Sequence, residues 1–175
     1  ASYQDLAFSF KVFALAERVI LSDRAYLYYR QDNMNSSVKS KTKVYCVCDE
    51  YDEIDRFLEE YPDLKFEFKV QEEINRYNGY VSSVLRIDDV VKPEFIKVFS
   101  EHFREEYASG LLGNEFFKKI NKKEFMTLIN KPEKYINVLK SIERKRKFNQ
   151  FRKNIFSIHF RNGRLNLTLF GKEVI

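Results

Sequence analysis

The stretch SYQDLAFSFKVFALAERVILSDRAYLYYR, residues 2–30, decides the expected fold. Its first half places apolar side chains at helical spacing behind an acidic capping box of Ser2 and Asp5, which predicts a helix over about 3–17. Its second half changes to β-branched and aromatic runs separated by a polar turn. These runs predict two strands, at 18–21 and 25–30. A polar loop over 31–37 follows.

Outward from this stretch, the pattern is helical for most of the chain. A helix is predicted from about residue 42 until Pro62 ends it, with one apolar face and one acidic face. The apolar face consists of Val44, Val47, Tyr51, Ile54 and Leu58. First-turn prolines and a capping box at Asn121 help to predict further helices, at about 64–86, 94–108, 114–120, 122–130 and 133–147.

The last segment changes from helical to alternating periodicity. Apolar and polar side chains alternate on both sides of Asn162-Gly163, the dipeptide preferred in type I′ turns, which predicts a β-hairpin over about 155–170. The expected fold class is therefore mainly α with short β elements, an α+β fold.

The composition is that of a globular chain without a membrane-spanning helix. Of 175 residues, 44% are apolar and 33% charged, and no uncharged apolar stretch approaches the roughly 18 residues that a span requires. Five Gly and three Pro favour helices over a many-stranded fold. The first residues contain neither an initiator Met nor a signal peptide, which predicts an excised piece of a longer protein.

The net charge of +5 conceals an asymmetry along the chain. Residues 1–117 carry 15 basic against 22 acidic side chains, a net charge of −7, whereas residues 118–164 carry 15 against 3, a net charge of +12. Such a basic segment could face anionic lipid or nucleic acid, although the solvated face of a helix is the commoner explanation.

Cysteine and histidine usage points to no metal site. Cys46 and Cys48 are too close for an easy disulfide, and a lone Cys-x-Cys is a poor zinc site, so both are expected to be reduced and partly buried. His102 and His159 stand singly in a predicted helix and a predicted strand, where a structural role is the commoner one.

Common catalytic motifs are absent from the sequence, but the order of motifs in residues 2–40 carries a resemblance. There is no phosphate-binding loop, no His-Glu-x-x-His and no Asp-x-Asp pair. The ordered motifs are Asp5, Phe8 with Lys11, Ala16 with Val19, Tyr28-Tyr29-Arg30 and Ser36-Ser37. They resemble the C-terminal end of the catalytic domain of bacterial family 2 glycosyltransferases of the GT-A type.

This resemblance implies that residues 1–40 are the end of a GT-A α/β catalytic domain, and residues 41–175 a helical C-terminal region closed by the hairpin. The family begins its helix with Glu-Asp, whereas this chain has Gln4-Asp5. By the resemblance, Asp5 is the general base of an inverting sugar transfer, since the chemistry needs a carboxylate opposite the leaving diphosphate. The implied substrate-binding residues are Gln4, Tyr29, Arg30 and Ser36.

The implied reaction moves a sugar from a nucleotide-sugar donor to a polysaccharide or lipid-linked acceptor of the cell envelope. In the family, the donor site and the pair that holds a divalent Mn or Mg ion lie upstream of this segment. We therefore expect this chain alone to be inactive and to hold no cofactor. The helical region would serve acceptor binding, homodimer formation or membrane association in a cytoplasmic protein, with peripheral contact at the inner face of the membrane through 118–164.

Two alternatives come from other classes of protein. The chain could be a non-catalytic helical interaction module, or a basic module that docks on anionic membrane or nucleic acid. Nucleic acid is the less favoured partner, because the segment from Lys140 to Lys153 interleaves only Phe148 and Phe151 with its basic side chains.

Overall fold

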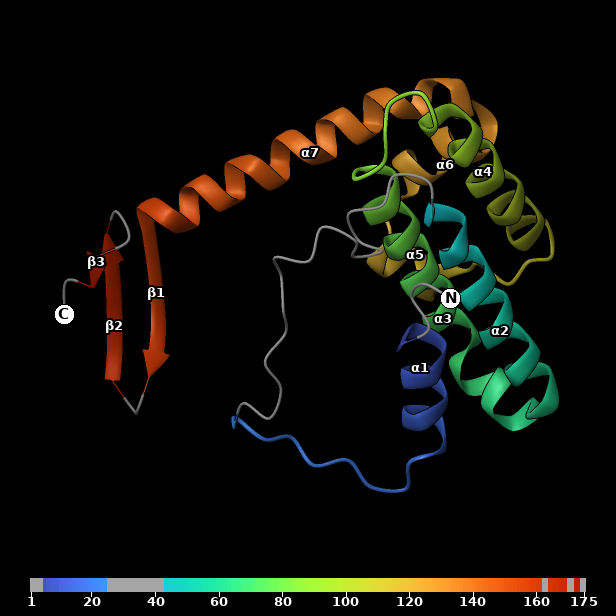
Figure 1. Ribbon diagram of the computed structural model, residues 1–175, viewed down its shortest axis with the longest axis horizontal. Coiled ribbons are helices and arrows are strands. Elements are labelled where there is room, and N and C mark those ends of the chain that lie inside the picture. Colours follow the sequence, from blue (N-terminus) through green and yellow to red (C-terminus); the bar gives the residue numbers. More distant parts are fainter. Residues whose placement is uncertain (1–4, 25–42, 162–163, 170–171, 174–175) are drawn as a thin grey trace. The chain divides into compact units, whose positions relative to one another are not determined.

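The computed structural model describes residues 5–24, 43–161, 164–169 and 172–173. The chain divides into two compact units, Ala1–Tyr135 and Ile136–Ile175. Figure 1 shows that helices make up the first unit, whereas the second contains most of one long helix and three short strands. The helix predicted at the start of the chain is present as α1 (Asp5–Leu15).

The other predicted helices are also confirmed, with small shifts at their ends. The last of them is longer than predicted, since it continues to Ile155. The bounds are a 3₁₀ turn at Lys43–Tyr45, α2 (Cys46–Glu60), α3 (Pro62–Val84), α4 (Lys92–Ala108), α5 (Asn114–Lys119), α6 (Lys122–Asn130) and α7 (Pro132–Ile155).

Local chemistry explains where these helices begin. Pro62 is the first residue of α3, a position where its missing N–H would have no partner within the helix. Asn121 caps α6, because its side-chain oxygen accepts a hydrogen bond from the backbone N–H of Glu124 at 3.1 Å. The capping box predicted at Asn121 is therefore confirmed on the Asn121 side.

An aromatic core holds the first unit together. The ring of Tyr77 on α3 packs against Phe99 and Phe103 of α4, and its hydroxyl lies 2.8 Å from the hydroxyl of Tyr135. Phe116 of α5 and Phe125 of α6 complete the cluster, and both are fully buried. Most of these ring pairs meet edge to face, the geometry that aromatic rings prefer.

The apolar face predicted for the helix from about residue 42 to Pro62 is confirmed, with Val44 in the 3₁₀ turn and the rest in α2. Its members, Val44, Val47, Tyr51, Ile54 and Leu58, are all buried. Cys46 and Cys48 are free and half-buried, as expected, and burial raises the pKa of the Cys48 thiol. Within the described part of the chain, no helix is both long and apolar enough to cross a membrane.

The predicted α+β fold is wrong, because the body of the molecule is all-α. Every element of the first unit within the described residues is helical, and residues 18–21 form no strand. A short strand needs a neighbour to take its backbone hydrogen bonds, and this segment has none among the described residues. The second predicted strand, at 25–30, lies outside them.

The strands that are present belong to the second unit. Strand β1 (Phe156–Arg161) pairs antiparallel with β2 (Arg164–Leu169), with Phe156 opposite Leu169 and Arg161 opposite Arg164. Strand β3 (Lys172–Glu173) pairs with the end of β2. The predicted turn at Asn162-Gly163 lies outside the described residues. The first unit is therefore all-α by itself, and the described strands are confined to the second unit.

Candidate functional site

Helix α1 lies against α2 and α3 through a small number of specific contacts. Lys11 Nζ is 2.5 Å from Glu53 Oε1 on α2, and the same ammonium lies 5.7 Å from the ring centre of Phe57. The Phe10 ring meets Phe57 of α2 and Phe68 of α3 edge to face, with ring centres 6.4 Å apart in each pair. These contacts hold α1 in place, but Ala7 is its only buried residue.

A first hollow opens at the N-terminal end of α1, with a volume of about 450 Å³. We call it the Asp5 hollow. It is lined by Asp5, Leu6, Ser9, Val47, Tyr51, Gly79, Ser82, Ser83 and Arg86. Asp5 stands exposed in the first turn of α1, while the two serines and Arg86 come from the end of α3 and the residues after it.

The polar groups of the Asp5 hollow include one that is buried and unsatisfied. Ser83 is 2% exposed, and its Oγ has no hydrogen-bond partner in the described part of the chain. Arg86 is fixed on one side, because its Nε donates to the backbone oxygen of Ser82 at 3.1 Å. A buried hydroxyl without a partner is unfavourable, so a ligand with hydroxyl groups would satisfy it.

Gly79 shapes the wall between the Asp5 hollow and the core. A Cβ at this position would lie 2.6 Å from the hydroxyl oxygen of Tyr51, so the absence of a side chain lets Tyr51 reach across. The Tyr51 hydroxyl donates to the backbone oxygen of Asn75 at 2.8 Å. Any larger residue at position 79 would displace the Tyr51 ring.

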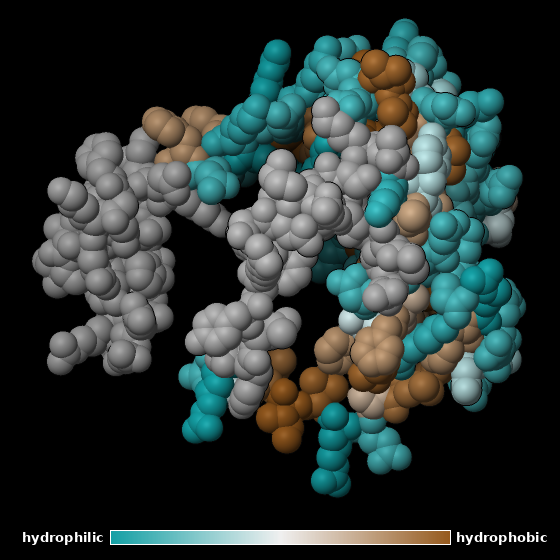
Figure 2. Space-filling model, in the orientation of Figure 1, coloured by the Kyte–Doolittle hydropathy of each residue, from teal (hydrophilic) through white to brown (hydrophobic). Residues whose placement is uncertain are grey.

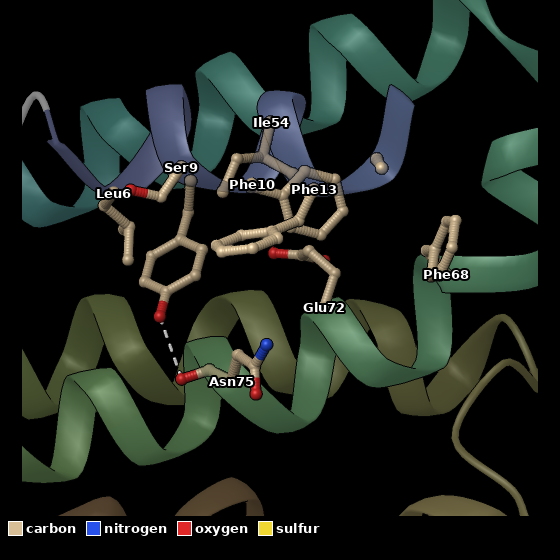
Figure 3. A pocket seen from close by; sticks show the side chains of 10 residues that line it. Leu6, Ser9, Phe10, Phe13, Ile54, Phe68, Glu72 and Asn75 are labelled. Atoms are coloured by element: carbon tan, nitrogen blue, oxygen red, sulfur yellow. Dashed lines mark hydrogen bonds between the residues drawn. The ribbon is translucent and has the colours of Figure 1, made fainter. Parts of the chain in front are cut away.

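A second hollow lies along α1, between it and the helices beneath, with a volume of about 330 Å³. We call it the phenylalanine hollow. It is lined by Leu6, Ser9, Phe10, Phe13, Ala14, Tyr51, Ile54, Phe68, Glu72 and Asn75. Figure 3 shows Glu72 pointing from α3 toward the Phe10 and Phe13 side of α1, with the Tyr51–Asn75 hydrogen bond beside it.

Beneath the phenylalanine hollow, α2, α3 and α4 enclose a network of charged side chains. Arg76 is 1% exposed, and its Nε lies 2.9 Å from Glu72 Oε1 while a terminal nitrogen lies 2.5 Å from Asp55 Oδ2. Lys69 Nζ lies 3.0 Å from Glu72 Oε2 and 2.8 Å from Glu73 Oε1. His102 of α4 joins the network, with Nε2 3.0 Å from Glu73 Oε2.

The carboxylates of this network differ in how readily they ionise. Burial raises the pKa of Glu72 to about 8, although Arg76 and Lys69 act against the shift. Burial would also raise the pKa of Glu73, but the hydrogen bond with His102 and the nearby cations outweigh it and lower the pKa to about 2. The network holds more carboxyl groups than permanent cations: Asp55, Glu72, Glu73 and nearby Glu106 against Lys69 and Arg76. This excess favours a proton on one of the buried carboxyl groups.

Two groups of side chains in the network have the spacing of metal ligands. Glu73, His102 and Glu106 form one group and Asp55, Glu72 and Glu73 the other, with ligand atoms within 4.8 Å of one another in each. Lys69 and Arg76 already occupy several of these carboxylate oxygens, so a cation would have to displace an ion pair. The metal ion implied by the resemblance belongs to a motif that this chain lacks.

Of the site residues predicted from the sequence, the structure describes only Asp5. Gln4, Tyr29, Arg30 and Ser36 lie outside the described residues. The structure brings Asp5 together with Ser82, Ser83 and Arg86, none of which the sequence singled out. Two adjacent serines and an arginine near a helix end form no recognisable sequence motif. Only the folding of the chain brings them close to α1.

Comparisons of the chain with protein-family models, with curated proteins and with solved structures found no match.

Proposed function

We propose that this chain is the C-terminal portion of a glycosyltransferase, and that the Asp5 hollow binds the sugar that accepts the transferred residue. The observation that carries the proposal is the position of Asp5 on the rim of a hollow that also contains the unsatisfied Ser83 hydroxyl. The motif order around Asp5 supports the same function, because it resembles the end of a family 2 catalytic domain.

The chemistry of the Asp5 hollow suits a polyhydroxylated ligand. A carboxylate accepts hydrogen bonds, a guanidinium donates them, and a serine hydroxyl does both, so Asp5, Arg86 and Ser83 complement the hydroxyls of a sugar. The volume of about 450 Å³ lies within the range of small-molecule sites. Neither a nucleotide nor its diphosphate is needed to explain this hollow.

In the proposed mechanism, an acceptor hydroxyl lies against the Asp5 carboxylate. Asp5 takes the hydroxyl proton while the oxygen attacks the anomeric carbon of the donor sugar. The new glycosidic bond forms as the bond to the nucleoside diphosphate breaks, and the diphosphate leaves on the opposite face with its electron pair. The donor would be bound by the nucleotide-binding part of the enzyme.

Replacing Asp5 by Asn tests the proposal in an enzyme that includes the donor-binding part. Asn caps helices about as well as Asp but cannot take a proton, so turnover should fall by about 10²- to 10⁴-fold while thermal stability changes little. Asp63→Asn is the matched control, since Asp63 is also an exposed first-turn aspartate, on α3. Near-normal turnover of Asp5→Asn would contradict the proposal.

A second candidate function is docking on an anionic membrane, and the exposure of α7 favours it. Residues 143–152 are exposed on every side of the helix, and Phe148 and Phe151 are 63% and 60% exposed. Basic residues dominate this stretch: Arg144, Lys145, Arg146, Lys147 and Arg152 stand against Glu143. A basic helix with exposed aromatic side chains is typical of a membrane-surface element.

Vesicle co-sedimentation distinguishes this second function from a merely solvated helix. Binding should require anionic lipid and should weaken steeply with added salt, because exposed charges are screened beyond a Debye length of about 8 Å at physiological ionic strength. Binding that does not depend on salt concentration, or no binding, would indicate that residues 143–152 form only a solvated helix.

A further inference from the structure

The two hollows flank the same stretch of α1 and share a wall. Leu6, Ser9 and Tyr51 line both, so a ligand in the Asp5 hollow lies next to the phenylalanine hollow. The first hollow presents a carboxylate, a guanidinium and hydroxyls, whereas aromatic and aliphatic side chains dominate the second. Both hollows are lined largely by apolar surface, but the Asp5 hollow adds hydrogen-bonding groups at one end. Such a pair of neighbouring hollows suits a ligand that has a polar head and an apolar tail.

Two of the polar side chains that line the phenylalanine hollow already have partners. The Tyr51 hydroxyl is bound to the backbone of Asn75, and Glu72 faces Lys69 and Arg76. Burial also favours the protonated form of Glu72, since it raises the pKa of this carboxyl to about 8. A second sugar would find few free partners here, whereas a hydrocarbon chain would replace water against apolar surface.

Further apolar side chains are exposed on α1 and in the segment after it. Phe13, which lines the phenylalanine hollow, is 64% exposed, and Val12 and Leu15 are also exposed on the same helix. Beyond α1, Ile20 and Leu21 are 92% and 94% exposed. Figure 2 shows hydrophobic surface in the region of α1 and the segment that follows it.

We propose that the phenylalanine hollow binds the hydrocarbon chain of a lipid-linked sugar acceptor whose sugar occupies the Asp5 hollow. This inference rests on the proposed function and narrows it, because it selects a lipid-linked acceptor over a free polysaccharide. It also gives α1 a role, as the helix that separates the head of the ligand from its tail. The loose packing of α1 is then what leaves room for the ligand.

A series of alkyl β-D-glucosides tests this inference on the chain itself. Methyl, hexyl and octyl glucoside differ only in tail length, and calorimetry below the micelle concentration of each gives the affinities. Each methylene that enters the hollow should tighten binding by about fourfold, the factor that corresponds to about 0.8 kcal/mol per buried methylene. Equal affinities for hexyl and octyl glucoside would overturn the inference.

Filling the hollow provides the matched variant. Ala14 lines the phenylalanine hollow and is half-buried, so Ala14→Leu should abolish most of the dependence on tail length. Ala108→Leu makes the same change at an exposed alanine near the end of α4 and should behave like the wild type. An undiminished tail-length dependence in Ala14→Leu would mean that the tail binds elsewhere.

In this design, the proposed sugar site and the proposed site for the hydrocarbon tail can be contradicted independently. If methyl glucoside binds and loses affinity in Arg86→Gln, but longer tails add nothing, the acceptor site stands and the lipid tail is ruled out. If longer tails add affinity that Ala14→Leu removes, while Arg86→Gln has no effect on any member of the series, the apolar site stands and the proposed sugar site is wrong.

Discussion

The aromatic core and the hollows beside α1 contain similar side chains, but these side chains are packed closely in the core and loosely at α1. In the core, Phe99 and Phe103 are fully buried and meet Tyr77 from two sides. On α1, Phe8 and Phe13 are 69% and 64% exposed, and hollows remain between this helix and its neighbours. Close packing stabilises the fold, whereas incomplete packing leaves space for a ligand.

The charged network lies between these regions and shows a third use of burial. The members of the network on α3, from Lys69 to Arg76, precede Tyr77 and Tyr80, which face the aromatic core from the same helix. Buried ion pairs add little net stability compared with apolar side chains of the same size, but removing one partner is strongly destabilising. We infer that the network fixes how α2, α3 and α4 meet more than it strengthens the contact.

The largest effect is expected in the core. Phe103→Ala should lower the free energy of unfolding by about 3–5 kcal/mol, because it removes a fully buried ring that contacts Tyr77, Phe99 and Phe116. Phe13→Ala is the matched control and should change stability by about 0.5 kcal/mol or less, since Phe13 is mostly exposed. Urea unfolding measures the free energy of unfolding of both variants. Equal losses of stability would contradict the distinction between the aromatic core and the hollows beside α1.

A smaller effect is expected in the charged network, and it depends on pH. The pKa of Glu72 is raised in the folded state, so its protonation contributes stability at low pH that is lost as the pH rises through about 8. Between pH 5 and 8, the free energy of unfolding should fall by about 1 kcal/mol per pH unit relative to Glu72→Gln, which cannot ionise. Parallel pH profiles for the two proteins would show that Glu72 stays ionised in the fold.

The helices could be predicted from the sequence because their signals are local. The periodic apolar face of α2, the capping box at Asn121 and the first-turn prolines each lie within one or two turns of the helix they define. The strand predicted at 18–21 shows the limit of such signals. Val19, Ile20 and Leu21 favour a strand by residue type, but a strand forms only where a neighbour pairs with it.

The candidate site was only partly predictable, because its groups come from distant parts of the chain. Asp5 could be named only through the resemblance carried by residues 2–40, whereas Ser83 and Arg86 gain significance only when α1 lies beside the end of α3. No sequence pattern predicted the phenylalanine hollow either, because Phe10 and Phe68, taken singly, are typical of ordinary core residues. Tertiary packing determines which apolar residues line a hollow, and no local sequence pattern predicts it.

The central claim, that the Asp5 hollow receives a sugar, can be tested most directly by mapping where a sugar binds. Titration of the isotopically labelled chain with methyl β-D-glucoside should shift the backbone amide resonances of residues 5–9 and 79–86, which border the hollow. The resonances of α6, which contributes no residue to the hollow, should stay unchanged. Shifts centred on other helices, or none at millimolar sugar, would contradict the account.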